Sequence, residues 1–581
     1  MNVMDFFPYP APRNGQEECI KWLVDKINGG EKFLIVDART GFGKSAVART
    51  LTDYFSKFYS CDSFIFTSTK MLQDQYYNDS QLYNAYGVSY GVGKGRGNFK
   101  CKQISHPLER VDKDDEYVYD LNGNAFYDYT GWFDENSKVT CSDGVCTIMG
   151  DDFTCPYSAL VHSEEYIHNS CNYLKMKYFT NKADVALLNY DVKVSDNVYT
   201  NGKNYHPRFL CIHDEAHNIE NCILNYTTLT LPVSSLEEDI NFNFLQEYWS
   251  YNHINQWLVI LNGMVEEYRL TVKKLDNDIK SRFYTKEEKE VLLFKLKKLI
   301  ARCQRIKRIY DYIIRDNGNW VVDLDEFNKK VEFKPLHVDK YTMDYLFESG
   351  IVHVFMSGSI ISPKKFCEGL GIPYNKDNVY TSEGIFDFKE HNPIIKCMVG
   401  RMDNKHVDKT KYLTIPVLKK IFNKHKGDKG LIHCNSKKLA DFIMESFKGT
   451  DFSNRLKCYG FLKSGVYPEK EKVINEFKSS NGDDIMVSYS LEEGVDLPYD
   501  ECRFQVFYKA PYLFLGDVRV KRMRTLDSDW YMLGTIRRLQ QMYGRGMRAV
   551  DDYCVNYALD SSLNDIFNHH LFPSYIREAV R

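Results

Sequence analysis

Long apolar runs are missing from this sequence, and none approaches the length needed to cross a lipid bilayer. The first twelve residues are aromatic and proline-rich, and they lack the basic flank and apolar core of a secretion signal. Internal repeats and low-complexity tails are missing as well. We therefore expect no membrane contact and a location in the cytoplasm.

A large net charge is missing too, because 76 Lys and Arg residues nearly balance 79 Asp and Glu residues and leave a formal charge of −3. This balance argues neither for nor against a nucleic-acid partner, since local basic stripes are enough to follow a phosphate backbone. The 581 residues, 43% of them hydrophobic and 27% charged, are typical of a globular protein with several domains.

The sixteen cysteines are mostly scattered, as expected of small buried apolar side chains in a reducing compartment. Five of them are instead grouped between residues 101 and 171: Cys101, Cys141, Cys146, Cys155 and Cys171. Four thiolates can hold either Zn²⁺ or an iron–sulfur cluster, and the ligand type does not separate the two. Buried cysteines without a metal are a third interpretation.

Residues 32–45 combine a short apolar strand, KFLIVD, with the loop ARTGFGKS, and a helical stretch follows. Strand, glycine loop and helix in this order are typical of a phosphate-binding loop, although an alanine replaces the first glycine of the strict pattern. Gly41 and Gly43 allow the tight turn that points backbone N–H groups at phosphates. We expect Lys44 to reach the β- and γ-phosphates of ATP and Ser45 to hold Mg²⁺.

A second apolar strand, FLCIH, ends in the carboxylates of Asp214 and Glu215, followed by Ala216 and His217. A carboxylate at the end of a strand can bind Mg²⁺ through water, and its neighbour can polarise the attacking water. We expect Asp214 to take the first role and Glu215 the second.

The pairing of this loop with a DEAH sequence resembles superfamily 2 helicases, and further segments resemble the XPD/DinG branch. In chain order they resemble the adenine-reading motif, motif Ia and motifs III, IV, V and VI, at 7–16, 67–75, 356–360, 430–436, 491–498 and 541–548. The resemblance implies nucleotide contacts by Arg13, Gln16, Thr40, Gly41, Gly43, Lys44, Ser45 and Asp214. It also implies a DNA-contacting role for motif Ia.

Motif VI has to complete the nucleotide site from the opposite lobe. Arg545 and Arg548 are permanently charged donors suited to the γ-phosphate, and we expect Arg548 to be the arginine finger. Gln541 is expected to sense the same phosphate. An ordinary pair of surface arginines on a helix is the alternative.

The cysteine segment resembles the iron–sulfur module of the same family. The sequence KGRGNFKC implies that Cys101 is the first ligand, and Cys171 is the last. Cys146 and Cys155 are expected between them, with Cys141 as the alternate for Cys146. The resemblance implies a 4Fe-4S cluster rather than zinc. A metal cross-link would stiffen a segment that has little apolar pattern of its own.

We therefore expect an α/β fold of two RecA-like P-loop domains, with an iron–sulfur module and a mainly helical Arch-type insertion in the first. The expected ranges are 1–90, 183–218 and 346–362 for the first lobe, 91–182 for the module, 219–345 for the insertion and 363–581 for the second lobe. Residues 250–315 show the apolar spacing of two long helices. Many basic residues on the second helix indicate either a DNA-facing surface or a solvated one.

The resemblance implies an ATP-dependent DNA helicase that moves along single-stranded DNA, 5′ to 3′, and unwinds duplexes in replication, recombination or repair. The alternative is a DNA-stimulated ATPase that strips or remodels nucleoprotein complexes. The expected partners are single-stranded and forked DNA, and the expected state is a monomer. High use of Lys, Asn and Tyr would suit a bacteriophage protein, which would act in the host cytoplasm.

Overall fold

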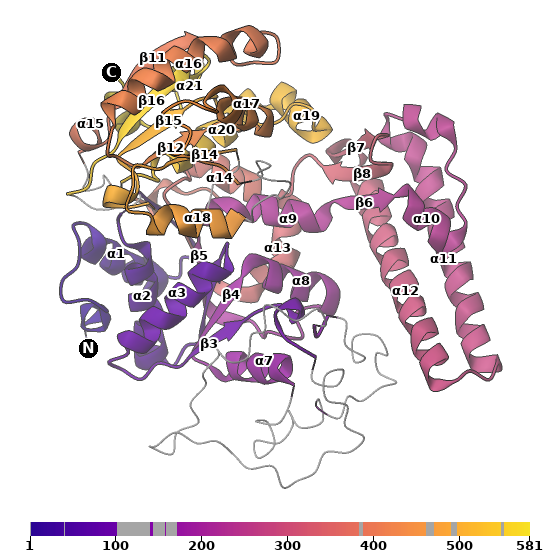
Figure 1. The fold of residues 1–581 in the computed structure, drawn as a ribbon. Helices are drawn as coiled ribbons and strands as arrows, with labels where there is room; N and C mark the ends of the chain where they lie inside the picture. Colours follow the sequence, from indigo (N-terminus) through magenta and orange to yellow (C-terminus); the bar gives the residue numbers. More distant parts are fainter. Residues whose placement is uncertain are drawn as a thin grey trace.

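The structure is a computed structural model that describes residues 2–39, 41–101, 140–142, 157, 171–382, 387–459, 470–489, 497–547 and 551–581. Two lobes, each built on a parallel sheet, lie one against the other, and a helical insertion extends to one side of them (Figure 1). We call the lobe that contains the phosphate loop lobe 1 and the other lobe 2.

Lobe 1 is built on a seven-stranded sheet whose strands are all parallel. Its strands, in spatial order, are β10 (Val379–Ser382), β1 (Phe33–Ala38), β9 (Gly350–Ser357), β5 (Arg208–Asp214), β2 (Ser63–Thr67), β4 (Val185–Asn189) and β3 (Tyr90–Gly93). The central strands are buried on both faces, which explains their continuous apolar runs. The carboxyl ends of β1 and β5 carry the phosphate loop and the DEAH sequence.

Helices cover both faces of this sheet. One face packs against α1 (Gln16–Asn28), α2 (Lys44–Tyr59) and α3 (Lys70–Leu82). The other packs against α8 (Tyr190–Thr200), α9 (Ile219–Thr227), α13 (Asp339–Tyr345) and α14 (Pro363–Leu370). Helix α7 (Asn172–Lys182), at the end of the cysteine segment, packs on β3 at the sheet edge.

Lobe 2 contains a six-stranded parallel sheet. Its order is β11 (Ile394–Gly400), β16 (Val555–Asp560), β15 (Phe504–Phe507), β12 (Gly430–His433), β14 (Ile485–Ser488) and β13 (Leu456–Lys457). Its helices are α15 (Phe388–His391), α16 (Val407–Lys424), α17 (Lys437–Ser446), α18 (Lys470–Ser479), α19 (Val518–Leu526), α20 (Ser528–Tyr543), α21 (Leu563–Phe567) and α22 (Ser574–Glu578). The expected α/β fold of two RecA-like domains is confirmed.

The change from lobe 1 to lobe 2 lies later than residue 362, where the sequence placed it. Strand β10 pairs in parallel with β1 and therefore belongs to the sheet of lobe 1, whereas β11 belongs to the sheet of lobe 2. Helix α14 packs in the core of lobe 1 as well. The sequence missed this because motif III precedes one more helix and strand of the same domain.

The insertion contains two long helices, α11 (Ile254–Ser281) and α12 (Lys286–Arg315), and the shorter helix α10 (Val233–Ile240). In Figure 1, α11 and α12 run side by side, in keeping with their extensive mutual contacts. A three-stranded antiparallel sheet joins them to the lobes: β6 (Leu229–Pro232), β8 (Lys330–Pro335) and β7 (Trp320–Asp325). The sequence analysis did not predict this sheet, because its strands are short.

Several basic side chains of α12 face the protein rather than solvent. Arg302 pairs with Asp239 and donates to Ser235, Arg305 donates to the Thr228 carbonyl at 2.8 Å, and Arg308 lies over the Tyr199 ring. These contacts bind α12 to α10 and to lobe 1. Within the described ranges, every helix is too short or too polar to span a lipid bilayer.

Candidate functional site

The phosphate loop is fixed in place by the segment before α1. Gln16 donates its side-chain amide to the carbonyls of Phe42 (2.8 Å) and Gly43 (3.1 Å), and Arg13 donates to the Gly41 carbonyl. Gly43 has φ +81°, and a Cβ there would lie 2.4 Å from the Gln16 amide nitrogen. Only glycine therefore fits at this position, where the loop enters the N-terminus of α2.

Asp214 lies buried at the end of β5, where Tyr76 of α3 donates a hydrogen bond to its Oδ2 at 3.0 Å. Ser45 lies near the Tyr76 hydroxyl, so this tyrosine stands beside both residues expected to hold Mg²⁺. Burial, together with the neighbouring Glu215, raises the pKa of Asp214 to about 6. A divalent cation would favour the ionised form. Tyr76 was not predicted, and only its place in the motif Ia helix could have suggested it.

Glu215 has a left-handed backbone, with φ of +48°, which is an unusual conformation for a residue with a side chain. Its carboxylate lies 3.7 Å from the Lys44 ammonium. His217 Nδ1 is 3.3 Å from Glu215 Oε2 and 2.8 Å from the Ser357 hydroxyl, which in turn lies 3.4 Å from Glu215 Oε2. The DEAH segment is therefore joined to motif III at the end of β9.

Lobe 2 contacts the DEAH segment and motif III through α20. The Gln541 amide donates to His217 Nε2 at 2.7 Å, which leaves Nδ1 of the imidazole to donate toward Ser357 and Glu215. On the same helix, Arg537 donates to the Ser359 carbonyl at 3.0 Å and Gln540 donates to the Gly358 carbonyl. Motif III, which belongs to lobe 1, is therefore hydrogen-bonded to α20 of lobe 2.

A cavity of about 300 Å³ opens between the lobes at this point. Its lining includes Lys44, Glu215 and His217 from lobe 1 and Gln541 and Arg545 from lobe 2. The predicted residues from distant parts of the sequence are thus brought to one cleft. Thr40 and Arg548 lie outside the described residues, so their assigned roles stay predictions. His217 and Ser357 were not predicted as site residues.

Three of the five grouped cysteines lie together beside lobe 1. Cys101, Cys141 and Cys171 are all buried in one cluster, with 3.6 Å between the sulfurs of Cys141 and Cys171. The Cys141 thiol and the backbone N–H groups of Leu174 and Tyr173 lower the pKa of Cys171, whereas hydrogen bonds to Cys101 and Cys171 raise the pKa of Cys141. Cys146 and Cys155 fall outside the described part of the chain.

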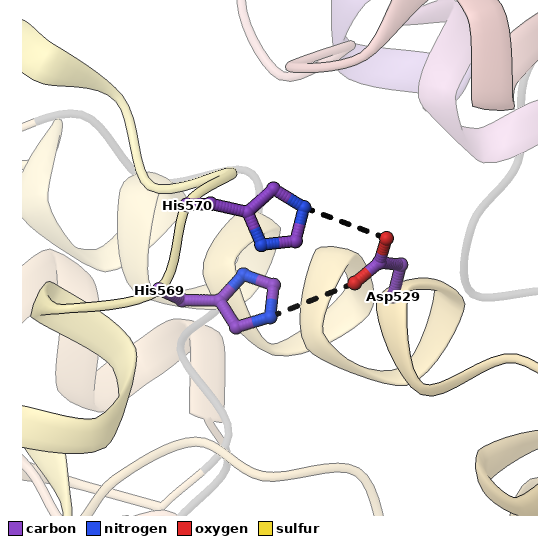
Figure 2. A group of neighbouring side chains, drawn as sticks. All are labelled: Asp529, His569 and His570. Carbon is purple, nitrogen blue, oxygen red and sulfur yellow. Dashed lines mark ion pairs between the residues drawn. The ribbon is translucent and has the colours of Figure 1, made fainter.

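A further group of ligand-type side chains lies on lobe 2 (Figure 2). Asp529 is in the first turn of α20, and its carboxylate oxygens lie 3.7 Å from His569 Nε2 and 3.5 Å from His570 Nε2. Burial and the neighbouring imidazole lower the pKa of His569. We interpret this group as polar contacts that hold the segment leading into α22 against α20.

Comparisons with known proteins agree with this geometry. The sequence matches the DEAD_2 family over residues 155–236, which include the DEAH segment, and the helicase C-terminal domain family over residues 418–579, which include α20. None of the curated proteins compared matches the sequence.

Solved structures share the fold over nearly the whole chain. An XPD helicase gives a TM-score of 0.57 at 13% identity and covers 98% of both chains. Xpd4 of S. tokodaii gives 0.54 at 13% identity, over 98% of this chain and 99% of that one. An apo XPD gives 0.50 at 14% identity, over 95% and 97%. The two family matches and this shared fold support a helicase with ATPase activity. It has a DEAD_2 segment in lobe 1, a helicase C-terminal domain in lobe 2 and an overall fold similar to that of the XPD helicases.

Proposed function

We propose that this helicase moves along single-stranded DNA in the 5′ to 3′ direction and separates duplexes. The observation that carries the proposal is a continuous hydrogen-bonded path from Gln541 of lobe 2 through His217 and Ser357 to Glu215. Glu215 is the group placed to polarise the attacking water. Loss of the γ-phosphate would therefore alter the hydrogen bonds that hold the lobes together.

Such a connection is what a motor requires. ATP is bound between lobes that each have their own core, so its binding and hydrolysis can change how the lobes sit relative to each other. If each lobe grips the strand in turn, the change becomes movement. The 5′ to 3′ direction is taken from the resemblance to the XPD/DinG branch.

A second cavity supports DNA as the track. It has a volume of about 520 Å³ and lies between lobe 1 and the cysteine segment, with Lys70, Arg96, Tyr173, Tyr199 and Tyr226 in its lining. Lys94 also lines it, but its ammonium is paired with Asp74. Basic groups that attract phosphates and aromatic rings on which bases stack are typical of single-strand binding surfaces. Tyr199 is 55% exposed, although Arg308 lies over one face of its ring.

The test is strand displacement on forks that carry either a 5′ or a 3′ single-stranded tail, with ATP and with Lys44→Ala as the inactive control. We expect displacement on the 5′-tailed fork alone, and none by the variant. Displacement that requires the 3′ tail would contradict the direction. ATP hydrolysis that DNA stimulates without displacement on either fork would instead support the remodelling of nucleoprotein complexes.

We also propose that Cys101, Cys141 and Cys171 bind a metal centre, with Cys155 as the fourth ligand. Cys141 replaces Cys146 in this proposal because it lies beside Cys171. Cys155 precedes Tyr157 by two residues, and the carbonyl of Tyr157 accepts a hydrogen bond from the Cys171 amide at 3.3 Å. The resemblance to the family makes a 4Fe-4S cluster our first choice, and its thiolate donor set fits these residues.

Zinc is the second candidate, because one observation favours it. The 3.6 Å between the two sulfurs is close to the edge of a tetrahedral zinc–thiolate site, about 3.8 Å for bonds of about 2.3 Å. Thiolates that bind separate irons of a cluster stand further apart. Iron and zinc content and visible absorbance of protein purified without oxygen decide between them. Cys141→Ser should lower the metal content, whereas Cys303→Ser, which changes a cysteine of α12, should not.

A further inference from the structure

Arg39, which follows β1 at the start of the phosphate loop, contacts lobe 2. Its guanidinium carbon lies 4.0 Å from the centre of the Tyr575 ring. Tyr575 belongs to α22, close to the end of the chain, and the two residues are 536 positions apart in the sequence. The contact is therefore an interlobe contact at the phosphate loop itself, and it is separate from the one between Gln541 and His217.

Tyr575 is held in position by two other residues. Its hydroxyl accepts a hydrogen bond from the Gln540 amide at 2.8 Å, and its ring packs 4.9 Å from the ring of Phe388. The same Gln540 amide donates to the Gly358 carbonyl of motif III. A second path therefore runs from the phosphate loop through Tyr575 and Gln540 to motif III.

The guanidinium of Arg39 is placed so that it can also bind an anion. Among the described residues, no hydrogen bond or ion pair to its guanidinium is found, and the ring covers only one face of the group. The N–H groups at its edge stay available to phosphate oxygens, which is the arrangement in which arginine binds them best. A cation–π contact of this kind corresponds to an affinity change of roughly two- to thirtyfold.

We propose that Arg39 and Tyr575 form an interlobe contact that positions the phosphate loop for ATP, so that affinity for the nucleotide depends on the arrangement of the lobes. Tyr575 is a positioning residue, because it acts through Arg39. The inference rests on the ATPase activity and not on the direction or the track of movement. Its test therefore uses ATP hydrolysis without DNA, which can be measured whether or not the protein displaces a DNA strand.

Steady-state ATP hydrolysis by the full-length protein tests the pair. We expect Arg39→Ala and Tyr575→Leu each to raise the KM for ATP about fivefold, within the range of a cation–π contact, with kcat changed less than twofold. Tyr575→Phe keeps the ring and should have a KM within twofold of the unaltered protein. Arg524→Ala is the matched control, because Arg524 lies 5.3 Å from the Tyr531 ring within lobe 2.

The double variant separates positioning from general damage. Residues that act through one contact are not additive, so Arg39→Ala with Tyr575→Leu should have the KM of either single variant. A product of the two single effects, or a KM in both single variants equal to that of the unaltered protein, would overturn the proposal. Thermal unfolding reports whether Tyr575→Leu folds. If Tyr575→Leu does not fold, the KM values of Arg39→Ala and Arg39→Lys are compared instead. Equal KM values for Arg39→Ala and the unaltered protein would refute the contact.

Discussion

The side-chain amide of Gln541 lies 2.7 Å from Nε2 of His217, and this hydrogen bond joins α20 of lobe 2 to the DEAH segment of lobe 1. Because His217 Nδ1 faces both Ser357 and Glu215, the amide also fixes which imidazole nitrogen carries the proton. Glu215, which we propose activates water, and Gln541, which joins the lobes, are thus separated by one side chain.

Gln541→Ala should lower kcat for ATP hydrolysis about three- to tenfold, since it removes one buried hydrogen bond and the orientation of His217. The KM for ATP should change little, because the substitution leaves in place the hydrogen bonds from Arg13 and Gln16 that hold the phosphate loop. Steady-state ATPase assays measure both constants. Gln246→Ala, on the surface of the insertion, is the control, and an unchanged kcat in Gln541→Ala would remove the coupling role.

Arg545 and Arg548 can be distinguished by substitution. If Arg548 is the arginine finger, Arg548→Ala should lower kcat by about a thousandfold and leave ATP binding nearly intact. Arg545 lines the interlobe cavity, and Arg545→Ala should have a smaller effect on kcat. Single-turnover hydrolysis and nucleotide-binding assays would report both values. The reverse order of effects would assign the finger to Arg545.

Tyr76→Phe should weaken the response to Mg²⁺, because the hydroxyl donates a hydrogen bond to Asp214 and lies near Ser45. We expect the Mg²⁺ concentration that gives half-maximal ATPase activity to rise about ten- to a hundredfold, the range that corresponds to one lost hydrogen bond to a charged group. The neighbouring change Tyr77→Phe is the control. The same Mg²⁺ dependence in all three proteins would show that Tyr76 is only a packing residue.

The stability of lobe 1 should depend on pH through two buried histidines. His213 Nε2 lies 3.0 Å from His353 Nδ1, and burial lowers the pKa of His353 to about 4 and that of His213 well below its usual value. The unfolded chain takes up these protons near pH 6.5, so the stabilisation is complete above that pH and is lost as the pH falls toward 4. Each histidine contributes a loss of about 1.4 kcal/mol per pH unit in this window.

Thermal unfolding between pH 7.5 and pH 5 measures this effect. His353→Gln cannot titrate but can still bond His213, so its Tm should fall less steeply as the pH is lowered. Its Tm at pH 7.5 should be lower, because an aromatic stack with Phe33 is lost. Parallel Tm curves for the two proteins would show that His353 carries no part of the acid sensitivity.

The local pattern around several motifs was sufficient to predict which of their residues lie close together. The strand before Gly41 and the apolar run before Asp214 indicated two parallel strands whose carboxyl ends meet at one edge, and the structure brings Lys44 and Glu215 to 3.7 Å there. The resemblance to the iron–sulfur module likewise implied that Cys101 and Cys171 lie close together, and both belong to one buried cluster. Tyr76, Ser357 and Tyr575 could not be predicted in this way, since each depends on which elements pack together.

The sequence by itself determined the two RecA-like folds and the residue types that meet ATP, because hydrophobic periodicity and loop chemistry act over a few residues at a time. Only the tertiary structure decided how the lobes are joined. The bond from Gln541 to His217 spans 324 positions of the chain, and the contact between Arg39 and Tyr575 spans 536. Contacts at such separations are set by the packing of whole domains, which leaves no pattern in the neighbouring sequence.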